Sequence, residues 1–230
     1  MLIENGFSIV NDVYSIDEVN HIIGVIDSAN SNNEAFRKTK DIFAIRKVLK
    51  EIPEIQPLIF NENLVRIMQS VGGEDCFVVK SIYFDKPEMS NWFVAYHQDL
   101  TISVDEKFEV EGFSNWTKKQ NQFSVQPPNY ILENIFTVRI HLDDTTAENG
   151  AVKVLEKSHL YGICRTESIN WSNEKEVVCE VNKGGVMLMK PLLFHASTRT
   201  TNQMRRRVLH IEFSNLMLNN NLEWSELLKI

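Results

Sequence analysis

The chain has 230 residues and a formal net charge of −7, and 43% of its residues are hydrophobic and 24% charged. These values are typical of a soluble globular protein, while the acidic charge disfavours nucleic-acid binding and no apolar run is long enough to cross a membrane. The start of the chain carries no secretory signal, and three cysteines without a Cys-x-x-Cys pair indicate reduced thiols, so we expect a cytoplasmic protein.

The first third of the chain carries mostly helical signals. Residues 5–10 indicate a short strand, and Ser15 with Glu18 then forms a capping box ahead of apolar residues at helical spacing. This pattern predicts a helix after Ser15. Residues 42–73 show helical periodicity that is interrupted by two prolines, so we expect two or three helices before the main sheet.

Strand patterns dominate after residue 76. Stretches rich in β-branched and aromatic residues occur at 77–84, 135–142, 186–190 and 208–213. No helix pattern alternates with them, which favours an antiparallel barrel or jelly roll over a doubly wound parallel sheet. We therefore predict a single domain over residues 1–230, with a helical part at about 1–75 and a β core at about 76–216. The long segment 101–129 is predicted to be an irregular loop that serves as a lid or binding segment.

A candidate metal site begins with His97 and Asp99. On an extended strand, residues two apart point to the same side, so one ion can contact both side chains. His195, which is expected at the end of a distant apolar strand, would complete the two-histidine, one-carboxylate set of non-haem iron oxygenases. However, His141 and Asp143 have the same spacing and could serve the same distal histidine. The alternative for His141 is a hydrogen-bonded ring at the end of the barrel, and for Asp143 a turn.

The strand over residues 205–213 carries a second signal. Its alternation places Arg206, His210 and Glu212 on one face, which is predicted to look into a pocket. A guanidinium group can bind a carboxylate through two parallel hydrogen bonds, which suits a dicarboxylic cosubstrate. The alternative is that Arg206 is a surface residue of the basic run Arg205–Arg207.

Several blocks then resemble one known family in chain order. These blocks are Phe84–Pro87 with Asn91 and Trp92, His97–Asp99, Val125–Pro128, Thr137–Asp144, Asn149–Gly150, Pro191–Ser197 and Arg206–Phe213. They resemble the phytanoyl-CoA dioxygenase family of Fe(II)- and 2-oxoglutarate-dependent oxygenases. The resemblance implies a mainly β fold with flanking N-terminal helices, namely a double-stranded β-helix of the jelly-roll, cupin-like type.

The resemblance also implies roles for individual residues. Iron would be held by His97, Asp99 and His195, with His141 as an unused rival. Other residues would contact 2-oxoglutarate: Arg206 and Ser197 at its distal carboxylate, and Gln98 and Lys80 nearby. With iron, 2-oxoglutarate and O2, no further catalytic protein group is needed, and Asp99 would be a ligand and not a base.

The substrate is predicted to be a small molecule. The candidates for contacting it are Trp92, Gln126, Thr137 and Arg139, while Arg139 could alternatively form a buried pair with Glu212. The expected reaction is hydroxylation of an unactivated C–H bond with release of succinate and CO2. Desaturation, epoxidation or cyclisation on the same triad is an alternative, as is a jelly-roll protein that binds metal or 2-oxoglutarate without turnover. The sequence carries no signal for an oligomeric state.

Overall fold

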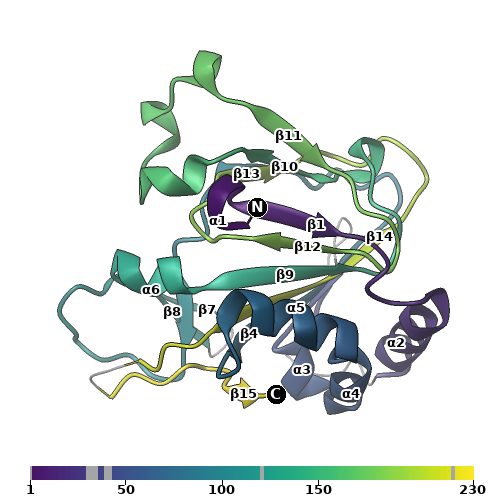
Figure 1. Ribbon diagram of the computed structural model, residues 1–230, viewed down its shortest axis with the longest axis horizontal. Coiled ribbons are helices and arrows are strands. Elements are labelled where there is room, and N and C mark those ends of the chain that lie inside the picture. Colours follow the sequence, from purple (N-terminus) through teal and green to yellow (C-terminus); the bar gives the residue numbers. More distant parts are fainter. Residues whose placement is uncertain (1, 30–35, 39–42, 120–121, 219–220) are drawn as a thin grey trace.

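Three antiparallel sheets form the β part of the protein, as the computed structural model shows for residues 2–29, 36–38, 43–119, 122–218 and 221–230 (Figure 1). The larger sheet has the strand order β1-β12-β9-β14-β4-β3-β2, with β15 also paired to β4. A smaller sheet has the order β11-β10-β13-β5, and a third has the order β6-β8-β7. This antiparallel arrangement is the predicted jelly-roll fold, which is confirmed.

The strand bounds follow the sheets. In the larger sheet they are β1 Phe7–Val10, β2 Phe36–Lys38, β3 Phe43–Arg46, β4 Phe77–Lys86, β9 Phe136–His141, β12 Val186–Met189, β14 Arg206–Ser214 and β15 Leu228–Lys229. In the smaller sheet they are β5 Val94–His97, β10 Val152–Leu155, β11 Glu176–Cys179 and β13 His195–Ser197. The third sheet comprises β6 Ile102–Val104, β7 Ser114–Lys119 and β8 Gln122–Gln126.

Helices cover the face of the larger sheet that is turned away from the smaller sheet (Figure 1). Their bounds are α1 Leu2–Asn5, α2 Ile16–Ser28, α3 Val48–Glu51, α4 Gln56–Ile59, α5 Glu62–Gly72 and α6 Asn129–Asn134, and α2 to α5 form this layer. The capping box that was predicted at the start of α2 is confirmed: the Glu18 N–H donates to Ser15 Oγ at 3.2 Å, and the Glu18 carboxylate accepts from the Ser15 N–H at 2.7 Å.

The two faces of the larger sheet carry different side chains because strand residues alternate in direction. On β9 and β14, Val138, Ile140, Leu209 and Ile211 are fully buried in the core beneath the helices. The opposite face carries polar and charged residues, among them Arg139, His141, Arg206, His210 and Glu212, which are also buried. A polar face of this kind, enclosed between two sheets, is where a functional site is expected.

Two segments differ from the sequence prediction. Residues 43–46 were predicted to be helical but form β3, because their backbone pairs with β4 at the edge of the larger sheet. Residues 101–129 do not form an irregular loop: apart from residues 120 and 121, which lie outside the described part, they contain the third sheet and the start of α6. Ile102, Val104 and Val125 pack there with the indole of Trp116 in a separate apolar cluster, and this burial stabilises the strands.

The cysteine prediction is confirmed, since Cys76, Cys164 and Cys179 are all free. Within the described residues, no helix combines the length and the apolar character that a bilayer crossing requires. The N-terminal part is less purely helical than predicted, because β1, β2 and β3 from this part join the larger sheet.

Candidate functional site

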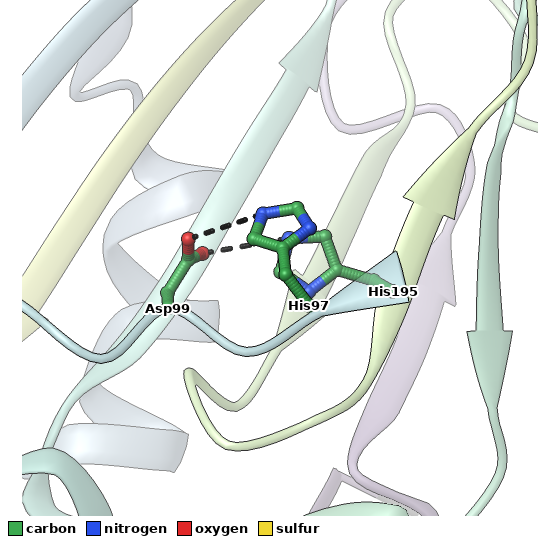
Figure 2. A group of neighbouring side chains, drawn as sticks. All are labelled: His97, Asp99 and His195. Atoms are coloured by element: carbon green, nitrogen blue, oxygen red, sulfur yellow. Dashed lines mark ion pairs between the residues drawn. The ribbon is translucent and has the colours of Figure 1, made fainter. Parts of the chain in front are cut away.

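Two neighbouring strands of the smaller sheet hold the candidate metal ligands (Figure 2). His97 is the last residue of β5 and His195 is the first residue of β13, and the two are directly opposite each other in the antiparallel register. Asp99 follows β5, and its N–H donates to the Pro191 carbonyl at 2.9 Å. Main-chain pairing therefore brings together three side chains that lie far apart in the sequence.

The ligand atoms of this triad converge on one point. Nε2 of His97 lies 3.8 Å from Asp99 Oδ1, and Nε2 of His195 lies 3.6 Å from Asp99 Oδ2. Each ring also contacts a main-chain carbonyl through Nδ1, namely that of Ala95 for His97 and that of Leu193 for His195, both at 2.9 Å. Because a carbonyl only accepts, Nδ1 carries the proton in both rings, and both Nε2 lone pairs are available to an ion.

The charges around the triad also suit a cation. Burial lowers the pKa of His195 to about 4, so this imidazole is neutral at neutral pH and can donate its lone pair. Burial by itself would raise the pKa of Asp99, but the attraction of His195, which is protonated in the acidic range where Asp99 titrates, and then of Lys80 holds it well below its usual range. Asp99 is therefore an anion between two histidine rings, which is the donor set of a two-histidine, one-carboxylate site.

The rival pair, His141 and Asp143, is committed to other contacts. Nδ1 of His141 lies 2.7 Å from Thr145 Oγ1, which agrees with the alternative of a hydrogen-bonded ring at the barrel end. The Asp143 carboxylate accepts three hydrogen bonds from Arg207, at 2.9, 2.8 and 2.7 Å. Asp143 is therefore engaged in a bidentate ion pair, and its carboxylate is not free to bind a metal together with His141.

A cavity of about 230 Å³ opens between the two sheets at the triad. Its walls come from β4, β5, β9, β10, β13, β14 and the segments on either side of β5. The lining residues are Phe84, Trp92, Val94, His97, Asp99, Arg139, Val152, His195, Ala196, Ser197, Arg206 and His210. The cavity therefore brings together the triad, the predicted cosubstrate residues Arg206 and Ser197, and two of the predicted substrate residues, Trp92 and Arg139.

Arg206 is a buried cation without a carboxylate partner among the described residues. Its side chain donates from Nη1 to the Gly150 carbonyl at 2.6 Å, while its buried Nε has no hydrogen-bond partner in the described part of the chain. Burial and then the nearby Arg139 lower its pKa to about 9. The two neighbours in the basic run differ, because Arg205 pairs with Asp85 and Arg207 pairs with Asp143. Arg206 is thus the member of the run whose charge is available to an anionic ligand.

Lys86, at the end of β4, does not line the cavity, but it is a buried cation paired in register with Arg206, and the sequence analysis did not single it out. It is completely buried, its Nζ donates to the Thr198 carbonyl, and burial and then Arg206 lower its pKa to about 7. Gly150 makes room for this group, since a Cβ at that position would lie 2.6 Å from Lys86 Nζ. Alternation along β4 could have identified Lys86, because it lies six residues after Lys80 on the same face.

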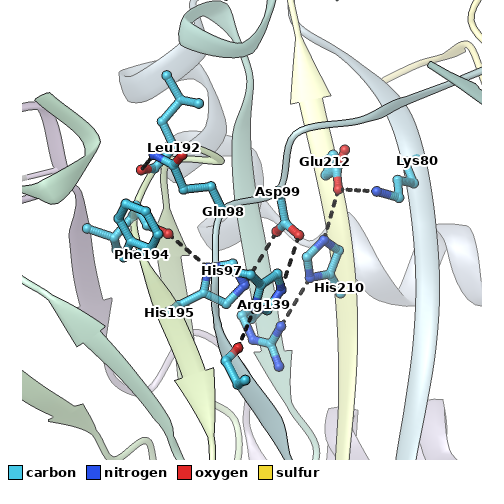
Figure 3. Close-up of polar contacts among 12 residues, drawn as sticks. Lys80, His97, Gln98, Asp99, Arg139, Leu192, Phe194, His195, His210 and Glu212 are labelled. Atoms are coloured by element: carbon cyan, nitrogen blue, oxygen red, sulfur yellow. Dashed lines mark hydrogen bonds and ion pairs between the residues drawn. The ribbon is translucent and has the colours of Figure 1, made fainter. Parts of the chain in front are cut away.

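A chain of polar contacts crosses the larger sheet beside the triad (Figure 3). Lys80 Nζ lies 2.7 Å from Glu212 Oε1, the same oxygen lies 3.1 Å from His210 Nε2, and His210 Nδ1 lies 3.1 Å from Arg139 Nη1. The expected pair between Arg139 and Glu212 is therefore wrong, because Lys80 from the neighbouring strand reaches the carboxylate and His210 separates it from Arg139. Lys80 is not among the residues that line the cavity, and its amine pairs with Glu212 beside the triad.

Three other sequence candidates lie away from the cavity. The Gln98 amide donates to the Gly162 and Leu192 carbonyls and accepts from the Cys164 N–H, so it ties neighbouring segments together and points away from the triad. Gln126 is on β8 in the third sheet, where Asn115 donates to it. Thr137 is buried on β9 without lining the cavity. A polar residue between two ligands in sequence points to the opposite side of an extended chain, which explains the position of Gln98.

The buried pair of Lys80 and Glu212 leads to a stability prediction. Glu212→Gln lowers the free energy of unfolding by about 3–5 kcal/mol, because it leaves the Lys80 charge buried without its partner. Urea denaturation measures the loss. As a matched control, Glu62→Gln removes the exposed partner of Arg66 and changes the stability by less than about 1 kcal/mol. Equal effects of the two substitutions would contradict a structural role for the buried pair.

Comparisons with known proteins agree with this fold. The solved structures similar to this chain include EctD from S. alaskensis with 2-oxoglutarate and 5-hydroxyectoine, at 18% identity and a TM-score of 0.71 over 93% of this chain and 73% of that one. HygX from Streptomyces hygroscopicus with nickel and 2-oxoglutarate is similar at 12% identity and a TM-score of 0.66, over 93% and 84% of the two chains. At this identity, the likeness shows the fold alone.

A third similar structure is the carbocyclase SnoK from nogalamycin biosynthesis, described as non-haem and α-ketoglutarate-dependent, at 14% identity and a TM-score of 0.66 over 93% of this chain and 81% of that one. Among curated protein sequences, no match was found. The family described as phytanoyl-CoA dioxygenase (PhyH), in contrast, matches residues 2–208, which is most of the chain and includes the triad, Arg139 and Arg206. The chain therefore belongs to the phytanoyl-CoA dioxygenase family.

Proposed function

We propose that this protein is an Fe(II)- and 2-oxoglutarate-dependent oxygenase that hydroxylates an unactivated C–H bond of a small-molecule metabolite and releases succinate and CO2. In this proposal His97, Asp99 and His195 bind the iron, while Arg206 and Ser197 bind the distal carboxylate of 2-oxoglutarate. Membership of the family supports the class of enzyme. The similar structures that contain 2-oxoglutarate, one of them together with nickel, support the choice of cosubstrate and metal.

The observation that carries the proposal is the buried, unpaired charge of Arg206 in the same cavity as the triad. A buried guanidinium without a counter-ion is unfavourable, so the ligand that enters this cavity is expected to bring a negative charge. A dicarboxylic 2-oxo acid suits both ends of the cavity, since one carboxylate can pair with Arg206 while the other end binds at the metal. The two Nε2 lone pairs and the Asp99 carboxylate leave room for such a ligand on a six-coordinate ion.

The residues of the chain have separate tasks in this reaction. When bound, the iron supplies the activation of dioxygen that an unactivated C–H bond requires. His97 and His195 offer neutral nitrogen ligands, because their protons are held on Nδ1 by main-chain carbonyls. Asp99 contributes negative charge and removes no proton from the substrate. Phe84, Val94 and Val152 form an apolar wall beside the triad, which limits access of water to the reacting atoms.

The proposal can be tested through its products. The purified protein, loaded anaerobically with Fe(II), is mixed with 2-oxoglutarate and a panel of small metabolites before air is admitted. Succinate and substrate masses are then measured. We expect at least one compound to stimulate succinate release and to gain one oxygen atom. A product that has lost two hydrogen atoms would show that the reaction is desaturation or ring closure and not hydroxylation. Tight binding of 2-oxoglutarate without succinate across the panel would contradict catalysis.

A further inference from the structure

Arg139 is a second buried cation in the cavity, and it comes from a different strand than Arg206. It is on β9 and only 8% exposed, and it lines the same cavity as the triad and Arg206. Arg139 on β9 is paired with His210 on β14, and His210 lies four residues after Arg206 along β14. The two guanidinium groups therefore belong to separate rows of the larger sheet and can serve different ligand groups in one cavity.

The contacts of Arg139 fix its position without neutralising its charge. Nη1 donates to His210 Nδ1 at 3.1 Å, and His210 can accept there because its Nε2 is directed at Glu212 Oε1, 3.1 Å away. The Glu212 charge is already balanced by Lys80 at 2.7 Å. Nε of Arg139 is buried and has no hydrogen-bond partner among the residues that the structure describes. No described carboxylate forms an ion pair with Arg139, and Asp99 acts on it only from a distance.

The balance of charges in the cavity points to a further anionic group. A divalent ion on the triad, Asp99, Arg139 and Arg206 together carry more positive charge than the two carboxylates of 2-oxoglutarate can balance. Because Lys86 lies close to Arg206 and is partly charged at neutral pH, it adds to this excess. An excess of buried positive charge is stabilised by a bound anion. The cavity therefore has enough positive charge to pair with both carboxylates of 2-oxoglutarate and still to accept a further anion.

We propose that Arg139 is a second carboxylate anchor of the cavity, held in place by His210 and separate from the anchor at Arg206. The carboxylate has two possible sources, namely the 2-oxo-acid end of 2-oxoglutarate or a carboxylate of the substrate. This inference rests on the proposed function, since it concerns the ligands of that same cavity. If 2-oxoglutarate does not bind Arg139, the anchor predicts that the substrate is a carboxylic acid.

The test compares the wild type with Arg139→Gln and Arg206→Gln by calorimetry on the nickel-loaded protein. A glutamine at position 139 keeps an N–H donor in the cavity wall but carries no charge. The first probes are 2-oxoglutarate and 2-oxopentanoate, which lacks the distal carboxylate. The third probe is propanoate, which is titrated into the protein already saturated with 2-oxoglutarate.

The two sources give different results. If Arg139 binds the 2-oxo-acid end, Arg139→Gln lowers the affinity for both 2-oxo acids by about 10- to 100-fold, whereas Arg206→Gln lowers the affinity only for 2-oxoglutarate. If Arg139 binds the substrate, Arg139→Gln leaves the affinities for both 2-oxo acids unchanged and lowers the affinity for propanoate by about 10-fold or more. Either result supports the anchor. Affinities for all three probes within about twofold of the wild type would overturn it.

Failure of the anchor and failure of the proposed function can be distinguished. If 2-oxoglutarate binds in an Arg206-dependent way and no probe depends on Arg139, only the anchor is wrong. If the wild type binds no 2-oxoglutarate, propanoate is titrated into the nickel-loaded protein alone. Binding of propanoate that is lost in Arg139→Gln then means that the anchor remains and the proposed function is wrong. Thermal melting of the ligand-free protein is the second readout: a purely structural Arg139 would lower the melting temperature when replaced, whereas removal of an unpaired buried charge does not.

Discussion

Asp99→Ala is expected to abolish metal binding and to reduce succinate release by at least about a thousandfold, because the metal contributes several kcal/mol to the reaction. Asp99 supplies the negatively charged ligand of the triad, and neither His97 nor His195 can replace that charge. Metal content after dialysis against Fe(II) or Ni(II), measured by mass spectrometry, gives the first readout. Succinate release in the presence of an accepted substrate gives the second.

The matched control is Asp143→Ala. Asp143 follows His141 by two residues, just as Asp99 follows His97, so the same substitution is made in the rival pair. Asp143 pairs with Arg207 at 2.7 Å and does not line the cavity, so its loss affects stability but leaves the triad in place. We expect this variant to bind one metal ion with nearly wild-type affinity. If Asp143→Ala lost the metal and Asp99→Ala kept it, the assignment of the site would have to move to His141.

Arg206→Gln is expected to raise the dissociation constant of 2-oxoglutarate by about 100-fold, which corresponds to losing the charge-assisted hydrogen bonds to one carboxylate. The physical reason is that Arg206 is buried, faces the cavity and has no carboxylate partner among the described residues. Calorimetry on the nickel-loaded protein measures the change. The substitution should not lower the free energy of unfolding, because it removes a buried charge that no group among the described residues balances.

The basic run supplies its own controls. Arg205→Gln and Arg207→Gln remove the same charge from adjacent positions, but these side chains pair with Asp85 and Asp143. Both variants are expected to bind 2-oxoglutarate within about threefold of the wild type, since their charges are partly screened and point away from the cavity. A similar loss in all three variants would mean that the general positive charge, and not Arg206 in particular, attracts the cosubstrate.

Much of the site could be predicted because strand alternation is a local rule. The face shared by Arg206, His210 and Glu212 follows from a period of two residues, and β14 keeps that period from Arg206 to Glu212. The three residues of the triad also come together as expected. Their proximity depends on strand pairing. The spacing alone did not separate His97 and Asp99 from His141 and Asp143, and the family resemblance selected the first pair.

Other features depended on partners that a single sequence does not reveal. His195 was expected at the end of the apolar strand before it, but β12 ends at Met189 and the chain crosses to the smaller sheet before β13 begins at His195. The partner of Glu212 was equally hidden, since Lys80 is 132 residues away in sequence and reaches it across β4 and β14. The partner of each strand residue depends on the register of the sheet, which is set by tertiary structure.

The hydrogen bonds from both histidine rings to the carbonyls two residues earlier have a consequence for metal uptake. Each imidazole is already held in one rotamer by its own strand before any ion arrives, so little side-chain freedom remains to be lost on binding. A flexible site loses side-chain entropy when the metal binds, whereas these two histidines have already lost it during folding. Different divalent ions should therefore exchange at this centre without rearrangement of the strands, and occupancy should depend on which ion is supplied.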